Sequence, residues 1–196
     1  MTSFIDTHCH LDKLDSTPEE AVKQAKQEGV VTMVTISVDE ESFDFVSNAV
    51  MQFKDVYGTV GVHPHDASEF NPSLEQSIRK LARGHEKMIA IGETGLDYHY
   101  MNSSRENQQF AFRKQLQIAV EINLPVVLHS REAEADTINI LKEIPVPALG
   151  VVHSFTSSIK MARTLLDMGW CLGINGIVTF KNAEDLREVV RWIPLD

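Results

Sequence analysis

The stretch "FIDTHCHLD" (residues 4–12) decides between two folds that the rest of the chain would allow. It begins as a strand, and side chains alternate along a strand, so His8 and His10 share one face while Cys9 points to the other. An open doubly wound sheet typically carries a Gly-rich phosphate-binding turn after its first strand, but here that position holds "THCHLD". We therefore expect a (β/α) barrel, with the open sheet as the alternative.

Seven short runs rich in Val, Ile or Thr alternate with longer amphipathic stretches, and these runs favour strands. Buried strands that alternate with helices predict parallel βαβ units. Seven such units favour an α/β fold of the TIM-type (β/α) barrel class, in a single domain over residues 1–196. The expected strands are 4–10, 30–38, 56–64, 88–96, 125–130, 148–155 and 171–180.

The clearest helix signal is "TPEEAVKQAKQEG" (residues 17–29). Thr17 is the expected N-cap, Pro18 the first helical residue and Glu20 the partner in a capping box, while Gly29 is the expected stop. Apolar residues recur at helical spacing in three further stretches, at 106–123, 158–169 and 183–193.

Composition is that of an ordinary globular protein, since 43% of the 196 residues are hydrophobic and 23% are charged. The chain contains no apolar run long enough to span a membrane, and Met1–Phe4 does not resemble the start of a signal peptide. Its two cysteines, Cys9 and Cys171, do not suggest a disulfide scaffold, so we expect a reducing, cytoplasmic setting. We expect a monomer or weak oligomer.

A formal net charge of −10 argues against an extended basic groove for long nucleic acid. Any nucleic-acid chemistry would need a small local site, helped by bound cations. The plainer interpretation of the charge is a soluble surface.

Histidine and acidic residues recur where the expected strands end, which is the side of such barrels that carries the chemistry. Each histidine taken alone would more simply be a structural hydrogen-bonding residue. Several partly buried imidazoles at one rim would lack polar partners, and a divalent ion supplies one. Imidazole and carboxylate together suit Zn, Mg, Mn or Fe. The strand-end residues are His8, His10, His63, His65, Asp66, Glu93, Asp97, His129, Arg131 and His153.

The motifs around these residues resemble those of the TatD-type metal-dependent hydrolases, a deoxyribonuclease branch of the amidohydrolase superfamily. The resemblance implies a TIM-type barrel, two divalent ions and cleavage of DNA phosphodiester bonds, typically from single-stranded DNA or strand ends. It implies the metal ligands His8, His10, Glu93, His129 and His153. The motifs are, in order, "FIDTHCHLD", "GTVGVHPHDA", "IGETGLDYHY", "QLQIAVEINLPVVLHSREA", "VVHSFTSS" and "LGINGIVTFKNA".

The C-terminal stretch "VVRWIPLD" (residues 189–196) departs from the family pattern. In the family, this region continues into an eighth strand that ends in a Thr-Asp-Ala-Pro-like motif, whose aspartate completes the metal site. The resemblance therefore implies seven of eight strands, with unpaired edges on the first and the seventh. We therefore expect the 196-residue form to be weakly active or inactive unless something else fills the gap in the barrel.

Glu93 is the expected shared ligand and catalytic carboxylate, with one ion between His8, His10 and Glu93 and another between Glu93, His129 and His153. Two ions held in this way clamp the attacking and leaving oxygens of a phosphoryl transfer.

His63 and His65 flank Pro64 and are candidates for substrate binding, with His63 also a candidate catalytic acid; a loop-structuring role is the alternative. Asp97 is expected to bond a ligand histidine. Arg131 and Lys181 could meet phosphate or form surface salt bridges.

Tyr98 and Phe155 are candidates for stacking on a base, with core packing the stronger expectation for Phe155.

Two other functions remain open. The same metals could hydrolyse a small ester, amide or lactone, which the net charge mildly favours. The chain could also be a non-catalytic barrel that binds a partner.

Overall fold

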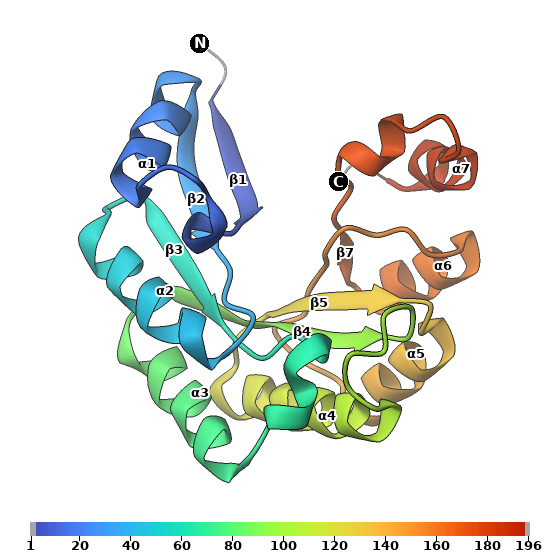
Figure 1. The fold of residues 1–196 in the computed structure, drawn as a ribbon. Helices are drawn as coiled ribbons and strands as arrows, with labels where there is room; N and C mark the ends of the chain where they lie inside the picture. Colours follow the sequence, from blue (N-terminus) through green and yellow to red (C-terminus); the bar gives the residue numbers. More distant parts are fainter. Residues whose placement is uncertain (1–2, 195–196) are drawn as a thin grey trace.

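Seven parallel strands form one curled sheet whose outer face is covered by helices (Figure 1). The structure is a computed structural model that describes residues 3–194. Neighbouring strands follow chain order, so β1 and β7 are the two edges of the sheet. The predicted (β/α) barrel class and the seven strands are confirmed. The strands are β1 (Phe4–Cys9), β2 (Val30–Thr35), β3 (Val56–Val60), β4 (Met88–Asp97), β5 (Val126–Arg131), β6 (Gly150–Val152) and β7 (Cys171–Leu172).

The last expected strand, at 171–180, is wrong beyond its first two residues. Residues Gly176–Thr179 form a short 3-10 helix, η3, because Asn175 caps it. The Asn175 side chain accepts a hydrogen bond from the Ile177 amide at 3.0 Å, and the Thr179 hydroxyl donates to the Gly176 carbonyl. Side-chain bonds to nearby backbone compete with strand formation, so they override the β preference of the Val and Ile here.

The first helix begins as its sequence predicts. The Thr17 hydroxyl accepts from the Glu20 amide at 3.3 Å, and the Glu20 carboxylate accepts from the Thr17 amide at 3.1 Å. Gly29 follows the helix at a φ of 90°, a conformation that favours glycine. The helices are α1 (Pro18–Gln27), α2 (Glu40–Gln52), α3 (Pro72–Gly84), α4 (Arg105–Ile122), α5 (Glu134–Glu143), α6 (Ile159–Asp167) and α7 (Glu184–Trp192), with short 3-10 helices η1 (Leu11–Lys13) and η2 (Pro64–Glu69).

The hydrophobic core lies between the sheet and this outer layer of helices. Phe112 and Leu116 of α4 are fully buried in it. A smaller cluster forms under β1, where Cys9 packs against apolar residues including Val22 of α1, as expected from its place on the strand. Among residues 3–194, no helix combines the length and apolar character needed to cross a membrane.

Because all seven strands are parallel, their C-terminal ends meet at one rim. His8 and His129 lie near the ends of β1 and β5, and Glu93 lies in the C-terminal half of β4. His153 follows β6 directly, and His63 lies in the segment between β3 and η2. The curl of the sheet brings these separate strand ends together.

Candidate metal centre

A cavity of about 400 Å³ opens at this rim and is lined largely by imidazoles and acidic side chains. A volume of this size is within the range of small-molecule sites. The lining residues are His10, Lys13, Val38, His63, His65, Asp66, Glu93, His129, His153 and Ser154.

His8, His10 and Glu93 form a first group that could hold a cation. The Nε2 atoms of His8 and His10 lie 3.3 Å apart, and His8 Nε2 lies 3.4 Å from Glu93 Oε2. His8 Nδ1 is buried and has no hydrogen-bond partner among residues 3–194. Two ring nitrogens and a carboxylate oxygen thus converge on one point, as expected for this triplet.

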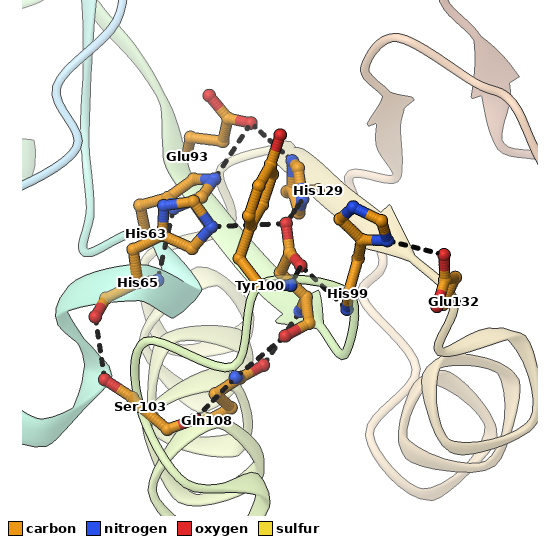
Figure 2. A network of polar contacts seen from close by, with 10 residues as sticks. His63, His65, Glu93, His99, Tyr100, Ser103, Gln108, His129 and Glu132 are labelled. Carbon is orange, nitrogen blue, oxygen red and sulfur yellow. Dashed lines mark hydrogen bonds and ion pairs between the residues drawn. The ribbon is translucent and has the colours of Figure 1, made fainter.

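His63, Glu93 and His129 form a second group. Glu93 Oε1 lies 3.2 Å from His129 Nδ1 and 3.8 Å from His63 Nε2 (Figure 2). The expected second triplet held His153 in place of His63. In the structure the His153 ring instead stacks on His8, with 3.3 Å between ring centroids and 9° between planes.

Glu93 is the carboxylate that the two groups share. It is only 4% exposed, and each of its oxygens faces a different group. Burial by itself would raise the pKa of this carboxyl, but hydrogen bonds from His129 and His8 hold it well below its usual range. Glu93 is therefore a buried anion that requires positive charge around it.

Asp97 supports the second group from behind, as the expected contact with a ligand histidine requires. Its Oδ2 lies 3.0 Å from His129 Nε2 and 3.2 Å from His65 Nε2. Its Oδ1 accepts from the backbone amides of His99 and Tyr100, which fixes the carboxylate. A carboxylate on the second ring nitrogen typically orients a metal-binding histidine.

Two histidines of the rim are held neutral. Burial lowers the pKa of His63 to about 3, and burial next to His8 lowers the pKa of His153 to about 4. A neutral imidazole has one ring nitrogen that can bind a metal or accept a hydrogen bond and one that can donate a hydrogen bond.

The tautomer of His63 follows from its neighbour. His63 Nδ1 accepts from the His65 amide at 3.2 Å, so the proton of the neutral ring lies on Nε2. His63 is therefore a hydrogen-bond donor into the cavity while this contact stands.

The donor set fits a divalent cation. It combines imidazole nitrogens from separate strand ends with one shared, buried carboxylate. Such mixed nitrogen and oxygen donors suit Zn or another first-row divalent metal.

The other predicted residues lie around the cavity rather than in its centre. His65 lines it, whereas Arg131 places its guanidinium 4.8 Å from the Tyr100 ring centroid, outside the lining. Lys181 is exposed beyond η3, also outside the lining. Phosphate binding by Arg131 and Lys181 stays a prediction.

Neither aromatic residue singled out from the sequence is free to stack on a base. Phe155 is 2% exposed in the core. Tyr98 donates its hydroxyl to Asp136, and Arg105 covers its ring.

Two rim residues were missed in the sequence. Lys13 lines the cavity, three residues after His10, and Tyr100 is 56% exposed beside His65. Lys13 could have been found in the sequence, because it is a positively charged residue three positions after His10. The sequence offered no such signal for Tyr100, which differs from Tyr98 only in lying farther beyond the end of β4.

Comparisons with known proteins agree on one family. Residues 5–196 match the family model described as "TatD related DNase". The chain is 39% identical over 196 residues to a Bacillus subtilis protein named uncharacterized metal-dependent hydrolase YabD, covering 98% of this chain and 76% of that protein. It is 37% identical over 199 residues to the Escherichia coli protein YcfH, which has the same description, covering 98% and 74%.

Solved structures agree with this. The crystal structure of YjjV, a TatD homolog from Escherichia coli, superimposes with a TM-score of 0.91 at 30% identity, covering 98% of this chain and 75% of that one. The chain therefore spans about three quarters of the length of these relatives.

Proposed function

The chain belongs to the TatD-related family of metal-dependent hydrolases, and from this premise we propose that it cleaves phosphodiester bonds at the end of a DNA strand. The family resemblance inferred from the motifs is confirmed. The bond that is cleaved, the use of two metal ions and the roles of single residues are our proposal.

The shared, buried Glu93 is the observation that carries the proposal. One oxygen faces His8 and the other faces His129, so a single carboxylate serves two groups of donors. A buried anion with four imidazoles around it is best compensated by cations. A pair of sites joined by one carboxylate suits the displacement of one oxygen by another at phosphorus.

We assign the metal ions to His8, His10, Glu93, His129 and His153. When bound, divalent ions would supply Lewis acidity, which lowers the pKa of water and offsets negative charge on phosphoryl oxygens. Asp97 keeps the His129 ring oriented through Nε2.

His63 has a different role, because its Nε2 carries the proton. It donates a hydrogen bond to a phosphoryl oxygen of the substrate. Lys13 adds a positive charge at the cavity mouth, where it would attract phosphate. The site is local, which agrees with a net charge of −10 and with recognition of a strand end rather than of a long duplex.

The test compares metal content with substrate range. Purified protein is analysed for bound metals, then assayed with Mg²⁺, Mn²⁺ or Zn²⁺ on single-stranded oligonucleotides labelled at the 5′ or 3′ end. We expect stepwise shortening from one end, lost after chelation with EDTA. Unshortened oligonucleotides in the presence of stoichiometric bound metal would overturn the nuclease assignment.

A second candidate keeps the metals and changes the bond. A cavity of about 400 Å³ also suits a small ester, amide or lactone, and the acidic surface favours a small substrate over DNA. A panel of such compounds in the same assay separates the two. Low metal content without hydrolysis of either class would instead favour a non-catalytic binding protein.

A further inference from the structure

We propose that Gln108 and Gln115 of α4 are positioning residues. Gln115 sets the spacing between the segment after β3 that carries His63 and the part of β4 that carries Glu93, and Gln108 fixes the end of β4 at Asp97. Both are fully buried, and they lie seven residues apart, on one face of the helix. The proposal rests on the proposed function insofar as the groups they position are taken to bind metal.

The side-chain bridges are needed because the strands separate at the rim. The register of β3 and β4 runs through Thr59 with Ala90 and ends at Val60 with Ile91. Beyond this point the backbone of each strand bonds elsewhere. Glu93 donates its amide to the Ser37 carbonyl at 2.9 Å, for example. The segments that carry His63 and Glu93 thus continue past the last described pair of the β3–β4 ladder.

Gln115 spans this gap. Its Oε1 accepts from the Val62 amide at 2.7 Å, and its Nε2 donates to the Val62 carbonyl at 3.0 Å. The same Nε2 donates to the Thr94 hydroxyl at 2.7 Å. One amide therefore pairs with Val62 as a neighbouring strand would and ties it to Thr94. Val62 precedes His63 and Thr94 follows Glu93, so Gln115 sets the spacing of these two site residues.

Gln108, two turns earlier in the helix, pairs its amide with the backbone of Asp97 in the same way but ties it to the loop that follows β4. Its Oε1 accepts from the Asp97 amide at 2.8 Å, and its Nε2 donates to the carbonyls of Asp97 and Ser103, both at 2.9 Å. Figure 2 shows Gln108 and Ser103 at the edge of the polar network around His129 and His65. Since the Asp97 carboxylate contacts both of these imidazoles, Gln108 acts on the site through Asp97.

The physical consequence is specific to the amide group. A methionine of similar length at either position would fill the space but leave the buried N–H and C=O of Val62 or Asp97 without a partner. The freed strand end would then shift to recover hydrogen bonds. Metal sites require ligands to be held within a few tenths of an ångström, so metal binding would weaken.

The experiment uses Gln115→Met and Gln108→Met with two controls on the same helix. Gln117→Met makes the same change at an exposed position, and Ile118→Val perturbs a fully buried core residue that carries no polar group. Affinity for Zn²⁺ and Mn²⁺ is measured by competition with a chromophoric chelator, together with thermal stability and with kcat and KM on the hydrolysed substrate.

We expect both glutamine variants to bind metal about tenfold more weakly or worse. Tenfold is the lower end of the loss that is typical when a residue supporting a metal ligand is replaced. kcat should fall with KM little changed. Ile118→Val should lower the melting temperature without weakening metal binding, and Gln117→Met should change neither.

A loss of stability in Gln115→Met with wild-type metal affinity and kcat would overturn the proposal. If that variant does not fold, Thr94→Val removes a single acceptor of Gln115 and should weaken metal binding in the same direction; unchanged binding would overturn the proposal equally. Metal affinity is measured without substrate. If the wild-type protein binds metal but does not cut DNA, the proposed function is wrong and this inference still stands. Wild type that binds no metal overturns both.

Discussion

Replacement of Glu93 by glutamine should abolish binding at both ion sites at once. The amide keeps the shape of the side chain but removes its negative charge, and Glu93 is the carboxylate common to the two described donor groups. A divalent ion in either group would then face imidazoles without the shared anion, at a position where the Glu93 side chain is only 4% exposed. Loss of one carboxylate should therefore affect two ions.

The size of the effect follows from burial. Removing one partner of a buried charge pair costs about 3–5 kcal/mol. With about 1.4 kcal/mol for each factor of ten, metal affinity should fall roughly 10²- to 10⁴-fold. The Glu93 carboxylate lies 3.2 Å from His129 and 3.4 Å from His8. Because these distances are similar, both donor groups should lose metal affinity to a similar extent.

Isothermal titration with Zn²⁺ or Mn²⁺ measures both affinity and stoichiometry. Wild type should bind two ions and Glu93→Gln none in the micromolar range, with hydrolysis lost in parallel. Glu132→Gln is the matched control, because Glu132 also pairs with a histidine at this rim but its side chain is 63% exposed. Two ions still bound by Glu93→Gln, or the loss of only one, would refute the idea of a shared carboxylate.

Other changes have graded outcomes. Asp97→Asn should weaken metal affinity about 10- to 100-fold in the same titration, less than Glu93→Gln, since Asp97 supports a ligand without belonging to either donor group. Removing metal with EDTA should lower the melting temperature, because an ion at 100 times its Kd stabilises the folded state by about 2.7 kcal/mol; an unchanged melting curve would contradict this. Phe112→Ala should cost about 3–5 kcal/mol in urea unfolding, because this side chain is fully buried in the core. Glu121 bonds Arg79 and Arg83, which lowers its pKa, so its contribution exists above the ordinary glutamate pKa and is lost as pH falls through the lowered value. Glu121→Gln should thus lower the melting temperature at pH 7 but not in strong acid, and a difference that grows with acidity would be the wrong sign.

Much of the fold could be predicted because its signals are local. The capping box at Thr17 and Glu20 depends on a few neighbouring residues and formed as expected. The strand predicted at 171–180 was wrong after Leu172, because the cap at Asn175 outweighed the strand propensity of "GIVTF" (residues 176–180). Hydrophobic periodicity does not reveal this competition.

The candidate site divides in the same way. Histidine and glutamate at strand ends were found because parallel strands share one rim. Which histidines pair could not be read from order along the chain, since the grouping of His63 with Glu93 and the stacking of His153 on His8 depend on how far the sheet curls. The buried glutamines of α4 looked like ordinary polar helix residues, and only their contacts with Val62 and Asp97 set them apart.

The stacked rings belong to His8, in β1, and His153, just after β6, and these two strands are not neighbours in the sheet. This contact closes a long loop of the chain, so it should form late in folding. An intermediate with native helices but a flattened sheet would keep most of its secondary structure and still lack the complete ring of donors. Uptake of a divalent ion by the proposed site would then report the final curling step.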